Sequence, residues 1–490
     1  MAHETGRADD ANSSLAKDRK WWLFCLLIFA LKFFLLALDP LPRLLMGDSG
    51  SYLWTAMTGW IPDDRSFFYG FVIRWVSVWR ESLTPLLLLQ AFLSGVTALV
   101  AASIGRAIFR FPVWLAYALG FICALDPLQL LWERYVMTET VSLFFYALIL
   151  SSSLMYLRDR RVSYLVFVHL FGVAVISLRM SFLLVTQLNA VLLPFAAFLP
   201  VMMQSLRARL SWPARLRSGQ LAAAHFLGSI LLMLALHAGY KRLNGWLAQT
   251  KPTYLQAAGN HVLAAWAPVI EPEDAPDPRL AEIIRQGDEY RIKDLTARAS
   301  QLYQGGFLFD RWAKVETDAG RFQKTVKQTA LNALRRNPFQ ILGLGWRTFS
   351  IYWNLSDLRD IAQSDLGYVD LTGDNVKDLA ERFHYSVSAS VTAAPPSILQ
   401  RYFLVSAPYC WVVLLSPIWG LLIFFRNRDW RFALFLLLQL GIIISTNMIF
   451  AVGPSLRYLQ PASLLTLICC AICVRAGLEI RNRGAEPARS

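Results

Sequence analysis

The stretch that decides the fold is Trp21–Tyr52, "WWLFCLLIFALKFFLLALDPLPRLLMGDSGSY". Residues 21–39 form an apolar run that is long enough to cross the ~30 Å hydrocarbon core of a bilayer. The polar sequence "MGDSGSY" follows at 46–52, where the chain leaves the bilayer. Gly, Asp and Ser favour turns, whereas a carboxylate at a membrane surface can also be a reactive group. The side of the membrane that Asp48 faces, and the residues that gather there, decide between these interpretations.

The composition is that of a membrane protein with several spans. Of the 490 residues, 56% are hydrophobic and 17% are charged, whereas a soluble protein carries about 25% charged residues. The net charge of +14 lies mostly in the tails and short loops, because the long polar stretch 240–403 is nearly balanced. This distribution excludes nucleic acid as a partner and is typical of Arg- and Lys-rich cytoplasmic loops. The six cysteines lie in or at the ends of apolar runs, so we expect no disulfide.

We expect about ten transmembrane helices, and the fold class is therefore an all-α polytopic membrane protein. Their approximate limits are 21–39, 84–105, 112–131, 137–156, 162–178, 181–203, 221–239, 404–424, 432–452 and 458–476. If the N-terminus is cytoplasmic, every cytoplasmic segment carries arginine or lysine, as the positive-inside rule requires. The sequence therefore predicts that both termini lie in the cytoplasm and that the long polar segment lies on the outer face of the membrane.

The domain organisation follows from these spans. We expect a cytoplasmic tail (1–20), a transmembrane domain (21–239) with a first outer loop (40–83), a periplasmic segment (240–403), C-terminal transmembrane helices (404–478) and a second cytoplasmic tail (479–490). The periplasmic segment is predicted to be mainly helical, because apolar residues recur at three- and four-residue steps in 278–304 and 310–336. Residues 335–355 are typical of an amphipathic helix near the membrane surface. We find no alternating strand pattern and no internal repeat.

Four groups of charged or aromatic residues lie at the outer ends of the spans. The first contains Asp48 and Tyr52, followed by Asp63, Asp64 and Arg65, in the first loop, and the second contains Asp126, Glu133, Arg134 and Glu139 around the turn before the fourth span. The third is Arg179 between the fifth and sixth spans, and the fourth is Arg457 with Tyr458 at the start of the last. An ionisable group at membrane depth costs ~3 kcal/mol or more, so it usually has a partner or a function. For Glu139, an ion pair with Arg134 or Arg179 competes with a catalytic role.

Arg179 and Arg457 depart from the charge rule, because both lie on the outer side. Arginine can bind phosphate oxygens through two parallel hydrogen bonds, so both residues are candidates for an anion site. Carboxylates and arginines at one membrane face suit a lipid-linked phosphate sugar as donor. A carboxylate takes the proton of an acceptor hydroxyl, and arginines hold the leaving phosphate. The chain contains no glycine-rich nucleotide-binding motif.

Five stretches, taken in order, resemble the GT-C superfamily of integral-membrane glycosyltransferases. They are "GDSGSYL" (47–53), "RSFFYGFVIRW" (65–75), "ERYVMTETVSLFFYALIL" (133–150), "LRRNPFQILGLGWR" (334–347) and "LRYLQPASLL" (456–465). The resemblance is to members that use polyprenyl-phosphate sugars, such as protein O-mannosyltransferases and the lipid A aminoarabinose transferase. It implies a fold with many spans in the bacterial inner membrane, with the long polar segment in the periplasm, and an inverting sugar transfer on the periplasmic side.

The resemblance also implies roles for individual residues. Asp48 matches the catalytic acidic residue of the first loop, Glu139 matches the acidic residue that begins the fourth span, and Arg457 matches the late arginine near the lipid phosphate. The other residues expected to bind substrate or lipid phosphate are Tyr52, Tyr69, Arg134, Arg179 and Tyr458.

The first loop departs from the family pattern at three positions. Ser49 stands where the protein mannosyltransferases have Glu, and Phe67 and Gly70 stand where the loop motif has Pro. These differences leave the donor sugar and the use of a divalent cation open, and no other cofactor is expected. The expected partners are a polyprenyl-phosphate sugar, membrane lipids, and an envelope glycan, glycolipid or protein as acceptor.

Two other classes of membrane protein are alternatives. A transporter or flippase of a lipid-linked solute is expected to have inverted repeats and broken helices with charges near the bilayer midplane. An O-antigen ligase or polymerase also has many spans and one large outer loop with arginines. His261, Trp54, Trp346 and Tyr352 are weaker candidates for substrate contact, because a lone His is a weak signal and aromatic belts are common at membrane interfaces.

Overall fold

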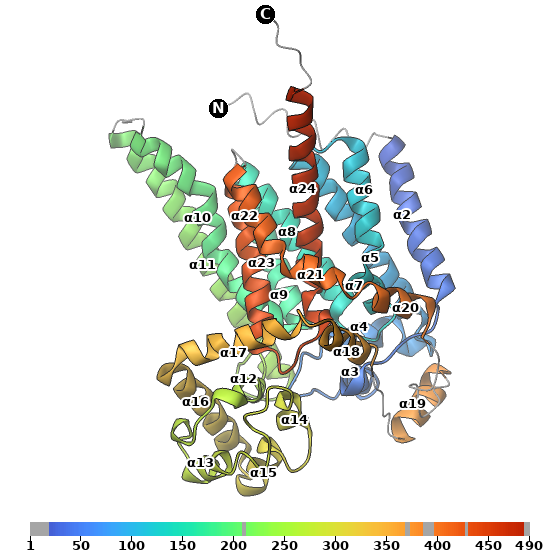
Figure 1. Cartoon of the computed structure of the whole chain (residues 1–490), viewed down its shortest axis with the longest axis vertical. Coiled ribbons are helices and arrows are strands. Elements are labelled where there is room, and N and C mark those ends of the chain that lie inside the picture. The colour runs from blue at the N-terminus through green and yellow to red at the C-terminus, as the bar shows by residue number, and fades with distance from the viewer. Residues whose placement is uncertain (1–18, 208–211, 368–372, 386–395, 427–429, 485–490) are drawn as a thin grey trace, which may run out of the picture.

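The computed structural model describes residues 19–207, 212–367, 373–385, 396–426 and 430–484. Within these ranges the regular structure is helical and contains no strand, apart from an isolated bridge between Arg43 and Tyr135 (Figure 1). The prediction of an all-α fold is therefore confirmed for this part of the chain. Most of the two predicted tails, at 1–18 and 485–490, lies outside the described residues.

Seven helices in the described ranges are long and apolar enough to cross a membrane. They comprise α2 (Arg19–Leu38), α5 (Thr84–Ala107), α8 (Glu139–Asp159), α10 (Leu183–Arg207, after the 3-10 turn Met180–Phe182), α11 (Trp212–Leu247), α23 (Trp430–Phe450) and α24 (Gln460–Gly484). An eighth crossing results if α20 (Ile398–Val405) forms one span, bent by 55°, with α21 (Tyr409–Leu414) and α22 (Ser416–Arg426). Two shorter apolar helices, α6 (Val113–Ala124) and α9 (Val162–Leu178), lie where the sequence predicts further spans.

Two predicted spans are interrupted in the structure. The span predicted at 112–131 divides into α6 and α7 (Pro127–Trp132), because Asp126 accepts a hydrogen bond from the backbone N–H of Leu128 at 2.8 Å and caps α7. Pro127 then occupies the first helical position, which suits a helix start. The span predicted at 404–424 is broken between α20 and α21, next to Pro408.

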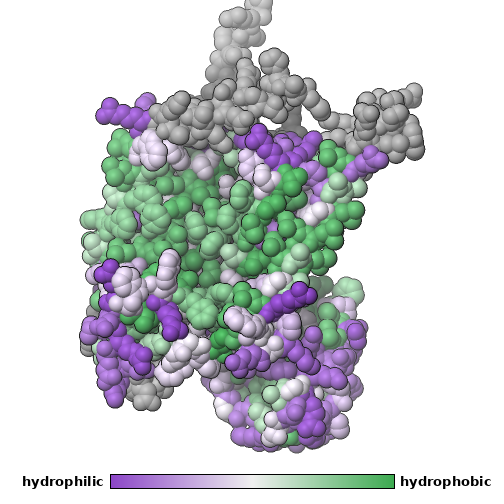
Figure 2. Space-filling view, turned by 180° about the vertical axis from the view of Figure 1, so that it is seen from behind, coloured by the Kyte–Doolittle hydropathy of each residue, from purple (hydrophilic) through white to green (hydrophobic). Residues whose placement is uncertain are grey.

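The apolar helices form a bundle with a lipid-facing belt. Figure 2 shows a broad hydrophobic band between hydrophilic surfaces at its two ends. α2 begins and α24 ends at the same end of the bundle, and α12–α16 lie at the opposite end (Figure 1). This arrangement requires an even number of crossings between the start of α2 and the end of α24.

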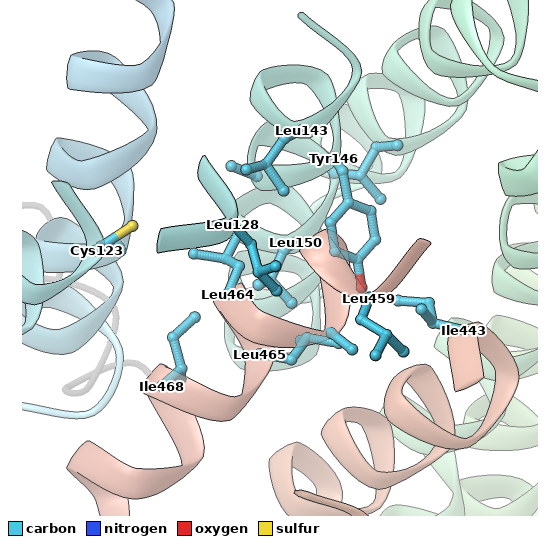
Figure 3. Close-up of a cluster of buried hydrophobic side chains, with 14 of the residues drawn as sticks. Cys123, Leu128, Leu143, Tyr146, Leu150, Ile443, Leu459, Leu464, Leu465 and Ile468 are labelled. Atoms are coloured by element: carbon cyan, nitrogen blue, oxygen red, sulfur yellow. The ribbon is translucent and has the colours of Figure 1, made fainter. Parts of the chain in front are cut away.

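The first part of α24 packs in the core of the bundle. Figure 3 shows Leu459, directly before this helix, and Leu464 and Leu465 within it, gathered with Tyr146 and Leu150 of α8. All five side chains are buried, and close-packed interiors of this kind allow little movement. The first turns of α24 are therefore held in a fixed position relative to α8.

The loops at the outer end are also helical. The first loop forms α3 (Met46–Thr58), α4 (Phe68–Val76) and a 3-10 turn at Val78–Arg80. The outer segment forms α12 (Ala258–Trp266), α13 (Pro278–Arg285), α14 (Arg298–Tyr303), α15 (Leu308–Val315), α16 (Ala319–Arg336), α17 (Pro338–Ile351), α18 (Leu355–Asp365) and α19 (Gly373–Phe383), with 3-10 turns at Ala267–Val269 and Pro272–Asp274.

Two long helices predicted in the outer segment are each divided in the structure. The stretch 278–304 turns after α13 at Gly287, where a Cβ would lie 2.8 Å from the carbonyl oxygen of Ile284. The stretch 310–336 is divided at Asp318, whose carboxylate accepts from the backbone N–H of Arg321 at 2.6 Å and caps α16. Local turn and capping residues therefore outweigh the apolar periodicity in this segment.

Candidate active site

Neighbouring residues of "MGDSGSY" perform separate tasks. Ser49 holds the start of α3: its hydroxyl accepts from the backbone N–H of Leu45 at 2.8 Å and donates to the carbonyl of Val136 at 3.0 Å. Ser49 is buried, so these contacts tie α3 to the stretch before α8. Asp48 takes no part in this turn, and its carboxylate accepts instead from two arginine side chains.

The Asp48 carboxylate bridges guanidinium groups from distant parts of the chain. Its Oδ1 accepts from Arg65 Nη1 at 2.5 Å, and its Oδ2 accepts from Arg457 Nη1 at 2.9 Å. The side chain of Asp48 remains 24% exposed, so the carboxylate is not sealed inside the protein. Burial raises the pKa of Asp48, but the charges of Arg457 and Arg65 outweigh it and hold this pKa below its usual range.

Arg65 belongs to the first outer group of charges in the sequence, but it is not among the site residues that the sequence predicts. It also donates to both oxygens of Asp64, at 3.0 Å and 2.6 Å. Burial lowers the pKa of Arg65, but the hydrogen bonds to Asp64 and the charge of Asp48 raise it above its ordinary value. Arg65 is therefore shared between two carboxylates of the first loop.

The outer segment contacts the first loop beside Arg65. His261 of α12 donates from Nε2 to the carbonyl of Asp64 at 2.8 Å, and the N–H of Ala257 donates to the carbonyl of Asp63 at 2.8 Å. Burial lowers the pKa of His261, so its imidazole is neutral at pH 7. In this arrangement His261 docks the outer segment onto the loop that carries Arg65.

Arg457 and Arg179 lie against the same aromatic ring. The guanidinium carbons of Arg457 and Arg179 are 4.9 Å and 5.5 Å from the centre of the Tyr458 ring. Nη2 of Arg179 lies 3.8 Å from Glu139 Oε1, and Nη1 of Arg179 is buried without a hydrogen-bond partner. Asp48, Glu139 and these three residues therefore form one cluster at the entrances of α8 and α24.

Tyr52 and Tyr69 lie next to this cluster. The two rings meet edge to face with their centres 5.2 Å apart, and the Tyr69 hydroxyl donates to Gln90 Oε1 at 2.7 Å. Burial, and then the nearby charge of Asp48, raise the pKa of Tyr52, so its phenol stays neutral. Tyr69 is fully buried, and its ring therefore supports Tyr52 without presenting a free face to a sugar.

Arg134 belongs to a buried ion-pair network with Glu133 and Lys32. Its Nη1 lies 3.5 Å from Glu133 Oε2, while Glu133 Oε1 pairs with Lys32 of α2 and accepts from Ser94 at 2.6 Å. All three charged side chains are almost fully buried, and removal of one partner from such a pair leaves an uncompensated charge. The structure thus groups Arg134 with residues inside the bundle, and Arg179 is the arginine that faces Glu139.

The acidic residues of the cluster do not fit a divalent cation. Both oxygens of Asp48 accept from guanidinium groups, and Glu139 faces Arg179, so a cation there would meet three positive charges. Across the residues that the structure describes, no three His, Cys, Asp or Glu side chains converge as metal ligands. The arginines supply the positive charge at this site.

Comparison with known proteins assigns no family. The chain matches no protein-family model, and it matches no curated protein. The functional argument therefore rests on the geometry of the residues themselves.

Proposed function

We propose that this protein is a membrane glycosyltransferase that moves a sugar from a polyprenyl-phosphate donor to an acceptor hydroxyl. The observation that carries the proposal is the Asp48 carboxylate, held between Arg65 and Arg457 at the entrance of α24. One carboxylate and two guanidinium groups provide a proton acceptor and an anion site at the same point. Their place at the end of a membrane helix suits a donor whose lipid tail stays in the bilayer.

The first step is an exchange of anions. The donor phosphate binds Arg457, with Arg179 next to it, and its oxygens replace the Asp48 carboxylate as hydrogen-bond acceptors. The phosphate then compensates the charge of Arg457, the larger of the two charges that lower the pKa of Asp48, while Arg65 stays bound to the carboxylate, so Asp48 becomes a stronger base once the donor is bound. This order couples the activation of Asp48 to the arrival of the donor.

Sugar transfer then follows as a single displacement that inverts the anomeric carbon. Asp48 takes the proton of the acceptor hydroxyl, and the hydroxyl oxygen forms a bond to the anomeric carbon. The bond between this carbon and the phosphate oxygen breaks, and its electrons remain on the phosphate. Arg457 and Arg179 stabilise the added negative charge of the polyprenyl phosphate that leaves. Glu139 orients Arg179.

The proposal includes an orientation in the bacterial inner membrane. Ten crossings result if α6, α9 and the bent α20–α22 unit each cross the bilayer once. Both termini then lie in the cytoplasm, where the Arg-rich short loops belong, and the Asp48 cluster faces the periplasm. The acceptor is accordingly an envelope glycan, a glycolipid or a protein.

Replacement of Asp48 by Asn tests the role of the carboxylate. Asn preserves size and can still accept a hydrogen bond, but it cannot act as a base at neutral pH. We expect Asp48→Asn to insert normally and to transfer sugar at least ~100-fold more slowly. Glu139→Gln should lower the rate of sugar transfer by a smaller factor, because Glu139 acts through Arg179. The measurement is the release of polyprenyl phosphate from a panel of labelled polyprenyl-phosphate sugars by protein in nanodiscs, with membrane acceptors added.

Asp360→Asn is the matched control, because Asp360 is exposed on α18 and should leave turnover unchanged. Near-normal turnover of Asp48→Asn would mean that Asp48 is not the base and that "MGDSGSY" is only a turn at the end of a helix. Failure of the wild-type protein to release polyprenyl phosphate from any donor in the panel would reject the proposed reaction.

Transport of a lipid-linked solute is the second candidate function. The 55° bend between α20 and α21–α22 and the buried Lys32–Glu133 pair inside the bundle favour it, since transporters use broken helices and intramembrane charges. A flippase moves the lipid-linked sugar between leaflets of a proteoliposome and leaves it intact. A transferase releases polyprenyl phosphate, so the same donor panel distinguishes the two functions.

A further inference from the structure

The loop between α23 and α24 carries Arg457, and side chains of the outer segment hold this loop. At the end of α23, Arg298 Nη1 donates to the carbonyl of Ala451 at 3.1 Å. At the other end of the loop, the Tyr352 hydroxyl accepts from the N–H of Ser455 at 2.8 Å and donates to the Ser455 carbonyl at 3.2 Å. Tyr352 is therefore a buried structural residue, not a surface on which a sugar stacks.

Among these side chains of the outer segment, Asp365, the last residue of α18, makes the contacts nearest to Arg457. Its Oδ1 accepts from the Ser455 hydroxyl at 2.7 Å, and its Oδ2 accepts from the backbone N–H of Leu456 at 2.6 Å. Leu456 begins the 3-10 turn Leu456–Leu459, which continues directly into α24. A carboxylate at a helix start satisfies N–H groups that have no partner in the helix.

The same end of α18 also contacts the chain just before α3. Gly367 has a φ of +87°, and a Cβ at this position would lie 2.9 Å from the carbonyl oxygen of Leu44. Only glycine accommodates both the left-handed conformation and this close approach. One turn of the outer segment thus lies against both chain segments that lead to the Asp48–Arg457 pair.

We propose that Asp365 is a positioning residue for the phosphate-binding arginine. By holding Ser455 and Leu456, it fixes the backbone at Arg457 and so directs the guanidinium toward Asp48 and the donor phosphate. The inference rests on the proposed function, because the ligand in question is the polyprenyl phosphate that Arg457 holds. It makes the outer segment part of the donor site, although Asp365 does not touch the donor.

The first test measures the dissociation constant of polyprenyl phosphate for the full-length protein in nanodiscs. Asp365→Leu removes both acceptor oxygens at similar size, and we expect at least about tenfold weaker binding. Asp365→Asn keeps one acceptor oxygen, so its affinity should lie between those of wild type and Asp365→Leu. Asp360→Leu on the exposed side of α18 should bind like wild type, and Arg457→Gln should bind no better than Asp365→Leu.

The second test reports the position of Arg457 without a donor. An arginine-specific dicarbonyl reagent followed by mass spectrometry gives the rate at which Arg457, whose side chain is 20% exposed, is modified. Release of the loop should raise this rate at least about threefold in Asp365→Leu, because local opening exposes the side chain. Asp360→Leu should leave the rate unchanged.

The outcomes separate this inference from the proposed function. Equal affinity and equal Arg457 reactivity in Asp365→Leu and Asp360→Leu reject the positioning role. If wild type does not bind polyprenyl phosphate, or Arg457→Gln binds it as tightly as wild type, the proposed function fails. The reactivity of Arg457 then still decides whether Asp365 positions it. If Asp365→Leu does not fold, the affinity and the Arg457 reactivity of Asp365→Asn are compared with those of Asp360→Leu instead.

Discussion

The Asp365 carboxyl group gives the protein a pH-dependent stability. Burial raises the pKa of Asp365 to about 6, although the Ser455 hydroxyl and the charge of Arg457 oppose this rise. The value for an unfolded chain is about 3.9, so the folded protein favours the protonated form. The stability that this group contributes is fully present below pH ~4 and is lost as the pH rises through ~6.

We therefore expect Asp365→Asn to gain stability relative to wild type as the pH rises. Asn resembles the protonated acid and has no ionisation to lose, so the difference in unfolding free energy should grow by about 1 kcal/mol between pH 5 and pH 7.5. Thermal unfolding of both proteins in detergent at these two pH values measures it. A difference that is constant with pH would mean that Asp365 titrates alike in the folded and unfolded states.

Individual residues show how far sequence reasoning reaches at this scale. Asp48, Arg457 and Glu139 are selected because each is an ionisable group at the end of an apolar run, and the structure brings them into one cluster. Arg134 meets the same criterion, yet it pairs inside the bundle, because the direction of a side chain after a short helix cannot be read from spacing. Asp365 gives no sequence signal, since its contacts join segments that are far apart along the chain.

Among the helices, α17 agrees best with its predicted amphipathic character. Asn337 caps it, with Oδ1 accepting from the N–H of Gln340 at 3.2 Å, and Pro338 occupies its first position. Ile341 and Leu344 are buried, and α17 lies across the end of the bundle, next to α16 (Figure 1). The amphipathic pattern of the sequence predicts α17 well because one side of this helix faces protein and the other does not.

We expect the exposed apolar side of α17 to lie in the membrane interface. Phe339, Leu342 and Trp346 are exposed on this helix, and such side chains favour the boundary between headgroups and acyl chains. A spin label at Leu342→Cys, in a cysteine-free protein in nanodiscs, should be accessible to oxygen and protected from a water-soluble nickel reagent. A label at Leu331→Cys on α16, which is also exposed, should show the opposite accessibility. Equal accessibility of both labels to the nickel reagent would place α17 in water.

Helix limits are less predictable where a polar residue can cap a new helix. Asp126 and Asp318 each begin a helix inside a stretch that the apolar pattern predicts as continuous. Apolar periodicity reports which face is buried, whereas capping depends on whether one carboxylate reaches a backbone N–H. The number of helices is therefore harder to predict than the helical class of the chain.

At the scale of the whole molecule, charge and hydropathy divide the protein into layers. The hydrophobic band in Figure 2 separates the end where α2 begins from the end that carries the outer segment. The composition predicts this layering, because bilayer thickness sets the length of the apolar runs. It does not predict which buried charges pair across the bundle, since the Lys32–Glu133 contact joins α2 to the turn before α8.

The orientation of these layers is the final prediction. Arginines crowd the short loops at the end where α2 begins and α24 ends, and such loops stay in the cytoplasm. A green fluorescent protein fused after Ser490 should therefore fluoresce, whereas alkaline phosphatase at this position should be inactive. Alkaline phosphatase inserted between Gly305 and Gly306, in the turn before α15, should be active, because it reaches the periplasm with the outer segment. The reverse pattern would place Asp48 and Arg457 in the cytoplasm, where the donor of the proposed reaction does not present its sugar.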